Sequence, residues 1–330
     1  MDVLSLALAL SFVPAFLCAA FIYWIDRYEK EPKLLLGGVF WWGAVVAAGG
    51  ALVSQLFLEG TVELATGSAE TAQLAGATLF APLTEESLKG MAVLVVFLIF
   101  RREFDSVLDG LVYAGVAALG FAATENVLYY IDANTKHGVE GMLGLWFVRG
   151  VLGAWDHPFY TAWIGLGLAV TRLSLSGAIR WLAPPAGWGL AVGAHSLHNV
   201  LATAAPRIHE LGVVMFLLDW TGWFVIAVVL LGAVWRERQM LRLQLADEVM
   251  RGTLDERQYR TALSAGFHLG ARVRALGSGR LLATRRFYRL CGELAHKKQQ
   301  LARLGDEDGA SLLVEKLREE MRQLAPLAAA

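Results

Sequence analysis

Two glutamates and a lysine lie close together in an otherwise apolar stretch of the sequence, residues 71–100. At ~100° per residue in a helix, Lys89 lies between Glu85 and Glu86 on one narrow face. A local ion pair accounts for one buried carboxylate. Two acids and one base leave a charge that needs a proton, a metal ion or an arginine from elsewhere. Carboxylates in this setting can act as general bases or as metal ligands.

Three more apolar stretches carry polar side chains of the kinds that do chemistry. An ionised side chain at the centre of a bilayer costs ~2.5–3.5 kcal/mol on insertion scales, so such residues indicate function or pairing. Small residues surround Glu125 and predict that its helix packs closely against neighbours. The stretches and their polar residues are 107–131 with Glu125 and Asn126, 141–171 with Arg149, Asp156 and His157, and 187–205 with His195, His198 and Asn199.

Spacing within these stretches suggests how the side chains are presented. His157 precedes Pro158, and a proline within a helix removes a backbone hydrogen bond, so we expect a bend there. Arg149 and Asp156 are seven residues apart and share a helix face, as a structural link or as part of a site. His195 and Asn199, with spacing i,i+4, also share a face.

The polar groups are expected to lie at similar depths in the membrane. Glu85 and His157 each lie about 15 residues from the start of their apolar stretches, and these two helices run in the same direction. His195 lies about 8 residues into a helix that runs the opposite way, which places it near the same plane. Glu125 is expected somewhat further out. Residues distant in sequence can therefore form one site.

Carboxylates and imidazoles together can activate water, either as general bases or as ligands of Zn²⁺, which lowers the pKa of its bound water. A carboxamide or an imidazole can stabilise an oxyanion, and peptide hydrolysis needs both functions. A proton-coupled carrier uses the same residue types, and polar side chains also join helices without any activity. Residue types alone leave hydrolysis, transport and a regulatory role open. An inverted repeat, which is common in carriers, is not evident in the sequence.

The elements that must position these residues are transmembrane helices. Of 330 residues, 56% are hydrophobic and 18% are charged, and the mean hydropathy is +0.49. A bilayer core is crossed by ~20 helical residues, and it offers no partners for an open sheet edge. We therefore predict an all-α, polytopic bundle with about seven membrane helices. The expected segments are 4–24, 34–58, 71–100, 107–131, 141–171, 187–205 and 211–235.

Charge separates the chain into two parts. Residues 1–235 hold 11 Lys and Arg against 18 Asp and Glu, whereas residues 236–330 hold 18 against 12. The first part is predicted to be the membrane core and the second a basic, mostly helical tail with breaks at Gly277-Ser278-Gly279 and in 305–309. The first apolar segment lacks a basic leader and is expected to be retained. The two cysteines, Cys18 and Cys291, exclude a disulfide framework.

Loop charges predict the orientation of the chain in the membrane. The first, third and fifth loops are richer in basic residues than the others, with Arg27 and Lys30 in the first and Arg101 in the third. The tail lies on the same side as these loops. We therefore expect an integral protein of a bacterial-type plasma membrane, with its N-terminus outside and its C-terminus in the cytosol. Nothing in the sequence indicates a nucleic-acid partner, and the oligomeric state is left open.

The order of the motifs resembles that of one known family. Glu85-Glu86-x-x-Lys89, Gly120-Phe121-Ala122-x-x-Glu125-Asn126, His157-Pro158 and His195-x-x-x-Asn199 occur in the order found in PrsW proteases. These proteases are similar to the wider group of CAAX-prenyl proteases and Abi proteins. The loop Asp26-Arg27-Tyr28-Glu29-Lys30-Glu31-Pro32 also resembles the segment after the first PrsW helix. The resemblance covers about residues 20–235.

The resemblance implies an intramembrane endopeptidase that cleaves a membrane-anchored protein, such as an anti-sigma factor. Glu85 with His157 would prepare the attacking water, while His195 and Asn199 would stabilise the oxyanion or hold the water. Glu86 and Glu125 would supply second carboxylates. The resemblance leaves a metal-dependent and a glutamate-dependent mechanism open, with Zn²⁺ as the expected ion in the first case. The candidate ligands are then Glu86, Glu125, His157 and His195.

Overall fold

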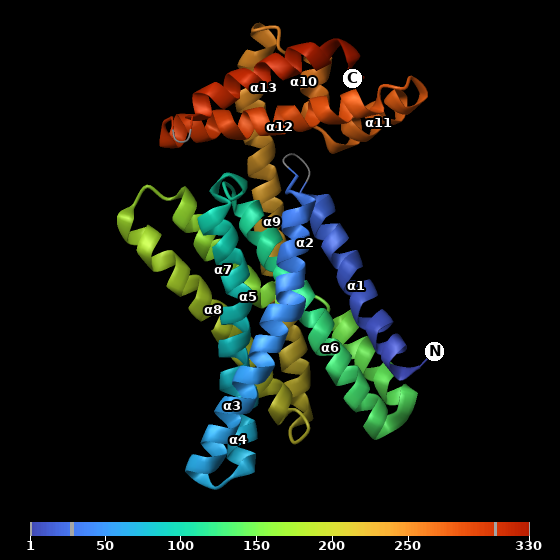
Figure 1. The fold of residues 1–330 in the computed structure, drawn as a ribbon, viewed down its shortest axis with the longest axis vertical. Helices are drawn as coiled ribbons and strands as arrows, with labels where there is room; N and C mark the ends of the chain where they lie inside the picture. Colours follow the sequence, from blue (N-terminus) through green and yellow to red (C-terminus); the bar gives the residue numbers. More distant parts are fainter. Residues whose placement is uncertain (1, 27–29, 307–308, 330) are drawn as a thin grey trace. The chain divides into compact units, whose positions relative to one another are not determined.

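A computed structural model describes residues 2–26, 30–306 and 309–329. Its described residues form helices and no strand, so the predicted all-α class is confirmed (Figure 1). The chain divides into two compact units, one of residues 1–24 and 31–230 and the other of residues 25–30 and 231–330. Predictions that concern Arg27, Tyr28, Glu29, Glu307 and Asp308 lie outside the described residues.

The first unit consists of long helices, several of which contain a short π-helical segment. Four runs are long and apolar enough to cross a membrane: Val3–Ile25, Lys33–Thr66, Val107–Leu173 and His209–Met250. Among the described residues, the helix Ala81–Ile99 is not one of these runs, and it carries Glu85, Glu86 and Lys89. The elements are α1 (Val3–Ile25), α2 (Lys33–Trp41), η1 (Trp42–Ala47), α3 (Ala48–Thr66), α4 (Ala69–Ala75), η2 (Gly76–Phe80), α5 (Ala81–Ile99), η3 (Arg101–Glu103), α6 (Val107–Trp146), η4 (Phe147–Leu152), α7 (Asp156–Leu173), α8 (Gly177–Ala204) and α9 (His209–Met250).

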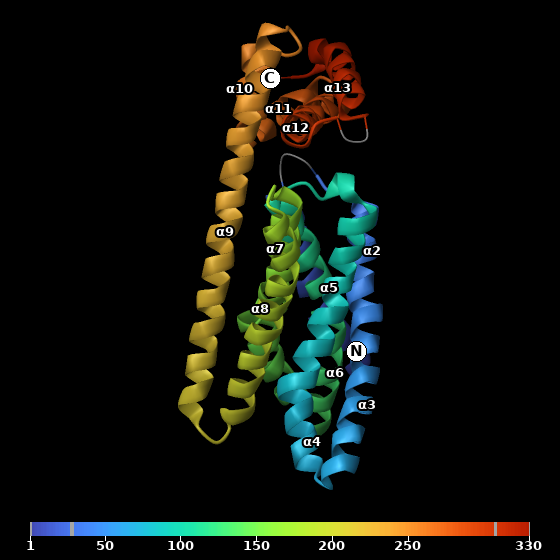
Figure 2. The ribbon, with the colours of Figure 1, turned by 90° about the vertical axis from the view of Figure 1, so that its left-hand side faces the viewer.

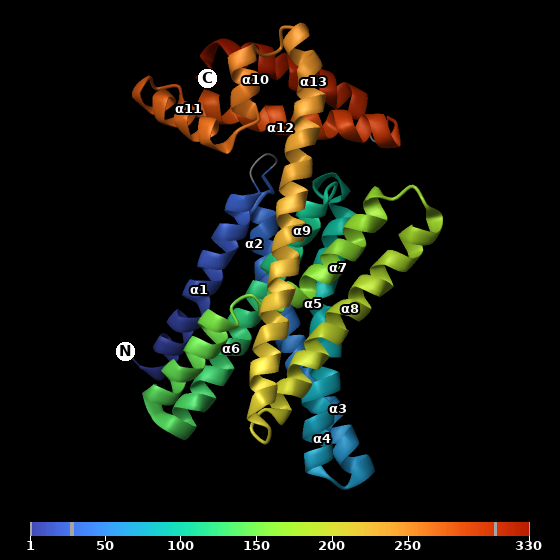
Figure 3. The ribbon, with the colours of Figure 1, turned by 180° about the vertical axis from the view of Figure 1, so that it is seen from behind.

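The segment expected over 141–171 is not one straight helix. Helix α7 begins at Asp156 and runs beside α8 (Figure 2). Helix α6 is interrupted at Gly138, where φ is +67°, and after η4 a turn leads to α7 (Figure 3). Pro158 therefore lies in the first turn of α7. The first four N–H groups of a helix have no partner within it, so a proline there breaks no helical hydrogen bond. The predicted bend at Pro158 is wrong.

Close backbone contacts join the helices of the first unit, as the small residues around Glu125 predicted. A Cβ added to Gly120 of α6 would lie 2.0 Å from the carbonyl oxygen of Phe40 in α2. A Cβ added to Gly165 of α7 would lie 2.1 Å from the carbonyl oxygen of Gly110 in α6. Such contacts replace side-chain interdigitation where lipid supplies no hydrophobic driving force. They hold α6 centrally between α2 and α7.

The π-helical segments border the polar residues of the bundle. Thr124 of α6 donates to the carbonyl of Ala44 in η1 at 2.7 Å, and Asn199 of α8 donates to the carbonyl of Ala77 in η2 at 2.8 Å. The third segment, η4, carries Arg149. π-turns are rare and are frequent at functional sites, because they release carbonyl groups from the helical pattern.

The second unit has a hydrophobic core of its own. It contains the end of α9 together with α10 (Glu256–Ala262), α11 (Ala265–Gly277), α12 (Leu281–Leu304), α13 (Ala310–Leu324) and η6 (Ala325–Leu327), shown from orange to red in Figure 3. Leu245, Phe287 and Leu294 are fully buried in this core. The predicted break at 277–279 is confirmed by the gap between α11 and α12. The tail is therefore a folded helical unit, not only a solvated extension.

Substituting Gly120 by Ala tests the contact between α2 and α6. The new methyl group would meet a backbone carbonyl that cannot move aside cheaply, so we expect a destabilisation of about 1–3 kcal/mol. Gly49→Ala in α3 is the matched control, because a Cβ there meets nothing within 4 Å. Thermal unfolding in detergent should show a lower midpoint for Gly120→Ala only. Equal midpoints for the two variants would contradict the close approach.

Candidate active site

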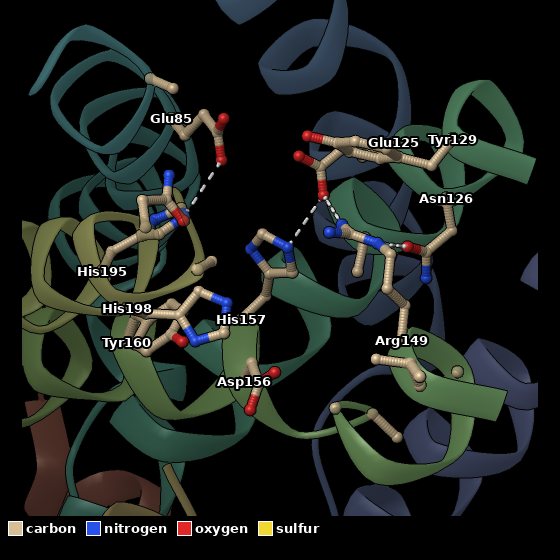
Figure 4. Close-up of a pocket in the computed structure, with 18 of the residues that line it drawn as sticks. Glu85, Glu125, Asn126, Tyr129, Arg149, Asp156, His157, Tyr160, His195 and His198 are labelled. Carbon is tan, nitrogen blue, oxygen red and sulfur yellow. Dashed lines mark hydrogen bonds and ion pairs between the residues drawn. The ribbon is translucent and has the colours of Figure 1, made fainter. Parts of the chain in front are cut away.

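A cavity of about 540 Å³ lies within the first unit and collects the polar residues singled out in the sequence (Figure 4). Its lining comes from helices that are far apart in the chain. Glu85, Glu125, His157, His195 and Asn199 all line it, together with apolar residues of α1, α6 and α9. Residues that are distant in the sequence therefore come together around one cavity, as expected.

The ammonium group of Lys89 lies behind this lining and is fully buried. Its Nζ is 2.6 Å from Glu86 Oε1 and 3.7 Å from Glu85 Oε2. The sequence prediction that Lys89 lies between the two glutamates is thus confirmed. Nζ also lies 3.2 Å from His157 Nδ1 and 4.3 Å from the centre of the Phe121 ring. Lys89 therefore ties α5 to α6 and α7.

His195 is held in a fixed orientation by two neighbours, Glu86 and Tyr160. Its Nδ1 lies 2.9 Å from Glu86 Oε1, and its ring stacks on Tyr160 with 4.7 Å between centroids. Glu86 also accepts a hydrogen bond from Thr161 Oγ1 at 2.8 Å. Because one ring nitrogen is engaged by Glu86, the other is directed toward Glu85, where Nε2 and Oε2 are 3.9 Å apart. A carboxylate behind a histidine is the usual support of a metal-binding imidazole.

The two carboxylate oxygens of Glu85 differ in their hydrogen bonds. Oε1 accepts a hydrogen bond from Gln55 Nε2 at 3.1 Å. Oε2 is buried and has no hydrogen-bond partner among the described residues. A buried carboxylate oxygen without a partner costs about 1–3 kcal/mol or more, so its retention indicates a ligand or a reaction partner.

His157 connects Lys89 to Glu125. Its Nε2 lies 3.0 Å from Glu125 Oε2, while the Lys89 ammonium approaches Nδ1. An ammonium group can only donate, so in this arrangement Nδ1 accepts and Nε2 carries the proton that Glu125 accepts. The carboxylate thereby fixes both the tautomer and the ring orientation of His157.

Glu125 is paired with Arg149 of η4, and Arg149 does not form the link to Asp156 that the spacing suggested. Arg149 Nη2 donates to Glu125 at 2.5 Å and Nε donates to Asn126 at 2.7 Å. Asp156 instead accepts a hydrogen bond from Trp223 of α9 at 3.2 Å. The turn between η4 and α7 separates the two residues that one continuous helix would have placed on one face.

Three side chains could hold a metal ion together. The ligand atoms of Glu85, His157 and His195 lie within 4.8 Å of one another. One carboxylate and two imidazoles match the donors that zinc takes in hydrolytic sites, and the unpartnered Glu85 oxygen belongs to this group. The residue types therefore fit a divalent ion, which would take the place of the Lys89 ammonium at Nδ1 of His157. Two candidate ligands predicted from the sequence, Glu86 and Glu125, lie outside this group because they support His195 and His157 instead.

A second group of this kind lies beside the first. Asp156, His198 and Asp219 also bring ligand atoms within 4.8 Å of one another, and His198 Nδ1 is 2.8 Å from Asp219 Oδ2. Tyr160 donates to Asp219 at 3.3 Å and so connects this group to His195. Asp219 was not among the candidate site residues predicted from the sequence. An acidic residue in the apolar run 211–235 was a signal that could have identified it.

Comparison with known proteins identifies the family. A family model described as "PrsW family intramembrane metalloprotease" matches residues 31–233. The chain belongs to the PrsW family. Protease PrsW of Bacillus subtilis (strain 168) is 30% identical over 173 residues, which are 51% of this chain and 71% of that protein. Protease PrsW of Geobacillus kaustophilus (strain HTA426) is 26% identical over 208 residues, 63% of this chain and 84% of that protein. No solved structure matches the chain.

Family membership decides among the functions that the residue types left open. The chain is an intramembrane protease, and not a carrier or a set of helices joined by polar contacts. The family is one of metalloproteases, which is consistent with a metal ion at the site. The match includes α5 to α8, which carry Glu85, Glu125, His157, His195 and Asn199.

Replacing Arg149 by Met tests the pairing of Glu125. The variant leaves a carboxylate with 19% side-chain exposure without its cation, and we expect a loss of about 3 kcal/mol in stability. Unfolding midpoints in detergent measure this loss. The double variant Arg149→Met with Glu125→Gln removes both charges and should recover part of it. Equal unfolding midpoints for the single and double variants would contradict the view that Arg149 balances the charge of Glu125.

Proposed function

We propose that Glu85, His157 and His195 form the centre that hydrolyses a peptide bond in a membrane-anchored protein. The observation that carries this proposal is the free oxygen of Glu85, which is buried, lines the cavity and faces His195. A water molecule in this cavity would find a carboxylate that can accept its proton. The Lys89 ammonium lies closer to Glu86, at 2.6 Å, than to this oxygen, at 3.7 Å.

In this proposal Glu85, His157 and His195 hold a zinc ion. When bound, zinc lowers the pKa of a coordinated water and polarises the scissile carbonyl. Glu85 would bind the ion through Oε2 and accept the proton of the attacking water at Oε1, while the oxygen of that water bonds to the carbonyl carbon. The proton then passes to the amide nitrogen, the C–N bond breaks, and an acid and an amine are released. The residues that line the cavity orient the water and the peptide bond during these steps.

Other residues have supporting roles in the proposal. Glu86 orients His195, and Glu125 orients His157 through the contacts described above. Asn199 lines the cavity and donates one amide hydrogen to Ala77, so its second amide hydrogen is available to an oxyanion. Glu86 and Glu125 are therefore positioning residues.

The substrate we propose is a protein with a membrane-spanning or juxtamembrane segment, in the manner of an anti-sigma factor. An intramembrane protease implies such a substrate and a surrounding bilayer. We also propose that the chain crosses the membrane about seven times, with its N-terminus outside and its C-terminal unit in the cytosol, as the loop charges predict. We also propose that the chain is related to CAAX-prenyl proteases and Abi proteins.

Loss of cleavage in two variants tests the catalytic assignment. Glu85→Gln removes the proton acceptor and His195→Ala removes an imidazole, so each should lower the cleavage rate at least about 100-fold. The assay uses purified protein in proteoliposomes with a validated membrane-anchored substrate. Glu70→Gln is the control, because Glu70 is exposed on α4 and pairs only with exposed Arg207.

Membrane insertion and unfolding midpoints must stay close to wild type for these losses to be read as catalytic. Full cleavage by both Glu85→Gln and His195→Ala would contradict the assigned site. Loss of cleavage in Glu70→Gln would show that the assay reports general damage to the protein.

A further inference from the structure

Helix α11 in the second unit presents an apolar stripe to its surroundings. Its inner side is formed by Ala271 and Ala275, which are fully buried. On the opposite side Leu269, Val273 and Leu276 are 65%, 61% and 64% exposed. Their spacing of i, i+4 and i+7 places them in one row along the helix. A helix whose small residues face the core and whose large apolar residues face outward is built to contact something else.

Basic residues surround this stripe. Between residues 257 and 292 the chain holds eight arginines and no lysine, aspartate or glutamate. At ~100° per residue, Arg272 and Arg274 lie on the two flanks of the apolar row. Both side chains are exposed, as is Arg280 just after the helix. The surface thus combines an apolar row with positive charge and carries no acidic group of its own.

Helix α13 lacks this combination. Leu312 of α13 is also highly exposed, at 70%, but it belongs to no row of exposed large apolar residues. The exposed positions that follow it include Glu315 and Glu319. Exposed apolar residues that occur singly are ordinary, whereas a row flanked by arginines is the pattern of helices that lie in a membrane interface.

We propose that the exposed face of α11 binds the surface of a bilayer that contains anionic phospholipids. Leu269, Val273 and Leu276 would enter the boundary between headgroups and acyl chains, and the flanking arginines would contact lipid phosphates. A bilayer is always close to this unit, because α9 runs without interruption from the first unit into the second. Because α9 tethers the second unit to the first, the effective concentration of bilayer surface available to α11 is raised. The inference is independent of the catalytic proposal.

A fluorescent probe on α11 tests the proposal in the full chain. The variant Leu276→Cys, in a Cys18→Ser background, is labelled with an environment-sensitive fluorophore, while Cys291 is fully buried and stays unlabelled. The protein is placed in nanodiscs of phosphatidylcholine alone or mixed with phosphatidylglycerol, each containing brominated lipid as a quencher. We expect a blue shift and quenching in the anionic discs that decrease with salt.

Two matched comparisons separate lipid binding from other causes. Neutralising Arg272 and Arg274 to Gln should lower the lipid-bound to unbound ratio about 30-fold, because each arginine near an anionic surface contributes about 1 kcal/mol. Neutralising exposed Arg303 and Lys316 removes the same charge elsewhere and should change the ratio little. A probe at Leu312→Cys should show no quenching in either disc.

The same measurements define what would overturn the proposal. Absence of quenching at position 276 in anionic discs, or equal quenching in neutral and anionic discs, contradicts binding to anionic lipid. Protection of the probe only after a membrane-protein extract is added would assign the face to a protein partner instead. Equal effects of the two charge-neutralised pairs would show that only net charge matters and would contradict a role for α11.

Discussion

The buried ammonium group of Lys89 is the interaction on which the site depends. It lies in the first unit without solvent exposure, and an isolated ion in such a place would be costly. Glu86 offsets most of this cost at 2.6 Å, and the same carboxylate orients His195. Lys89 also approaches His157. One cation thereby fixes a carboxylate on its own helix and, through it, His195 on α8, and it contacts His157 on α7 directly.

The charges of the site do not cancel among the described residues. Glu85, Glu86 and Glu125 are three carboxylates, while Lys89 and Arg149 are the permanent cations that contact them. One negative charge is left when all are ionised, and the free oxygen belongs to Glu85. A cation or a proton at this position would complete the balance. The unbalanced negative charge raises the free energy of the site without a ligand, and the same charge favours binding of a cation.

Much of the site could be predicted because helical periodicity applies directly to its residues. The position of Lys89 between Glu85 and Glu86 follows from 100° per residue, and the close packing around Gly120 follows from small side chains. The roles within the site were harder. Sequence cannot show that Glu86 is occupied by Lys89 and His195 while Glu85 keeps a free oxygen, because that depends on contacts between helices.

The errors have equally specific physical causes. Hydropathy does not register a short turn between two apolar segments, so the sequence predicted a bend at Pro158 instead of the turn that precedes Asp156. The turn places Arg149 against Glu125 and frees Asp156 to contact Trp223. The core of the second unit was also missed, because mixed charges on its helix surfaces conceal the buried row that includes Phe287 and Leu294.

Metal content of the purified protein tests the central claim most directly. Elemental analysis of detergent-solubilised wild type should find close to one zinc per chain, and Glu85→Gln and His195→Ala should lose it. Glu86→Gln, which removes only a supporting carboxylate, should retain the site with about 10–100-fold weaker affinity. Fully active, correctly folded wild type without bound metal would contradict a metal centre of Glu85, His157 and His195.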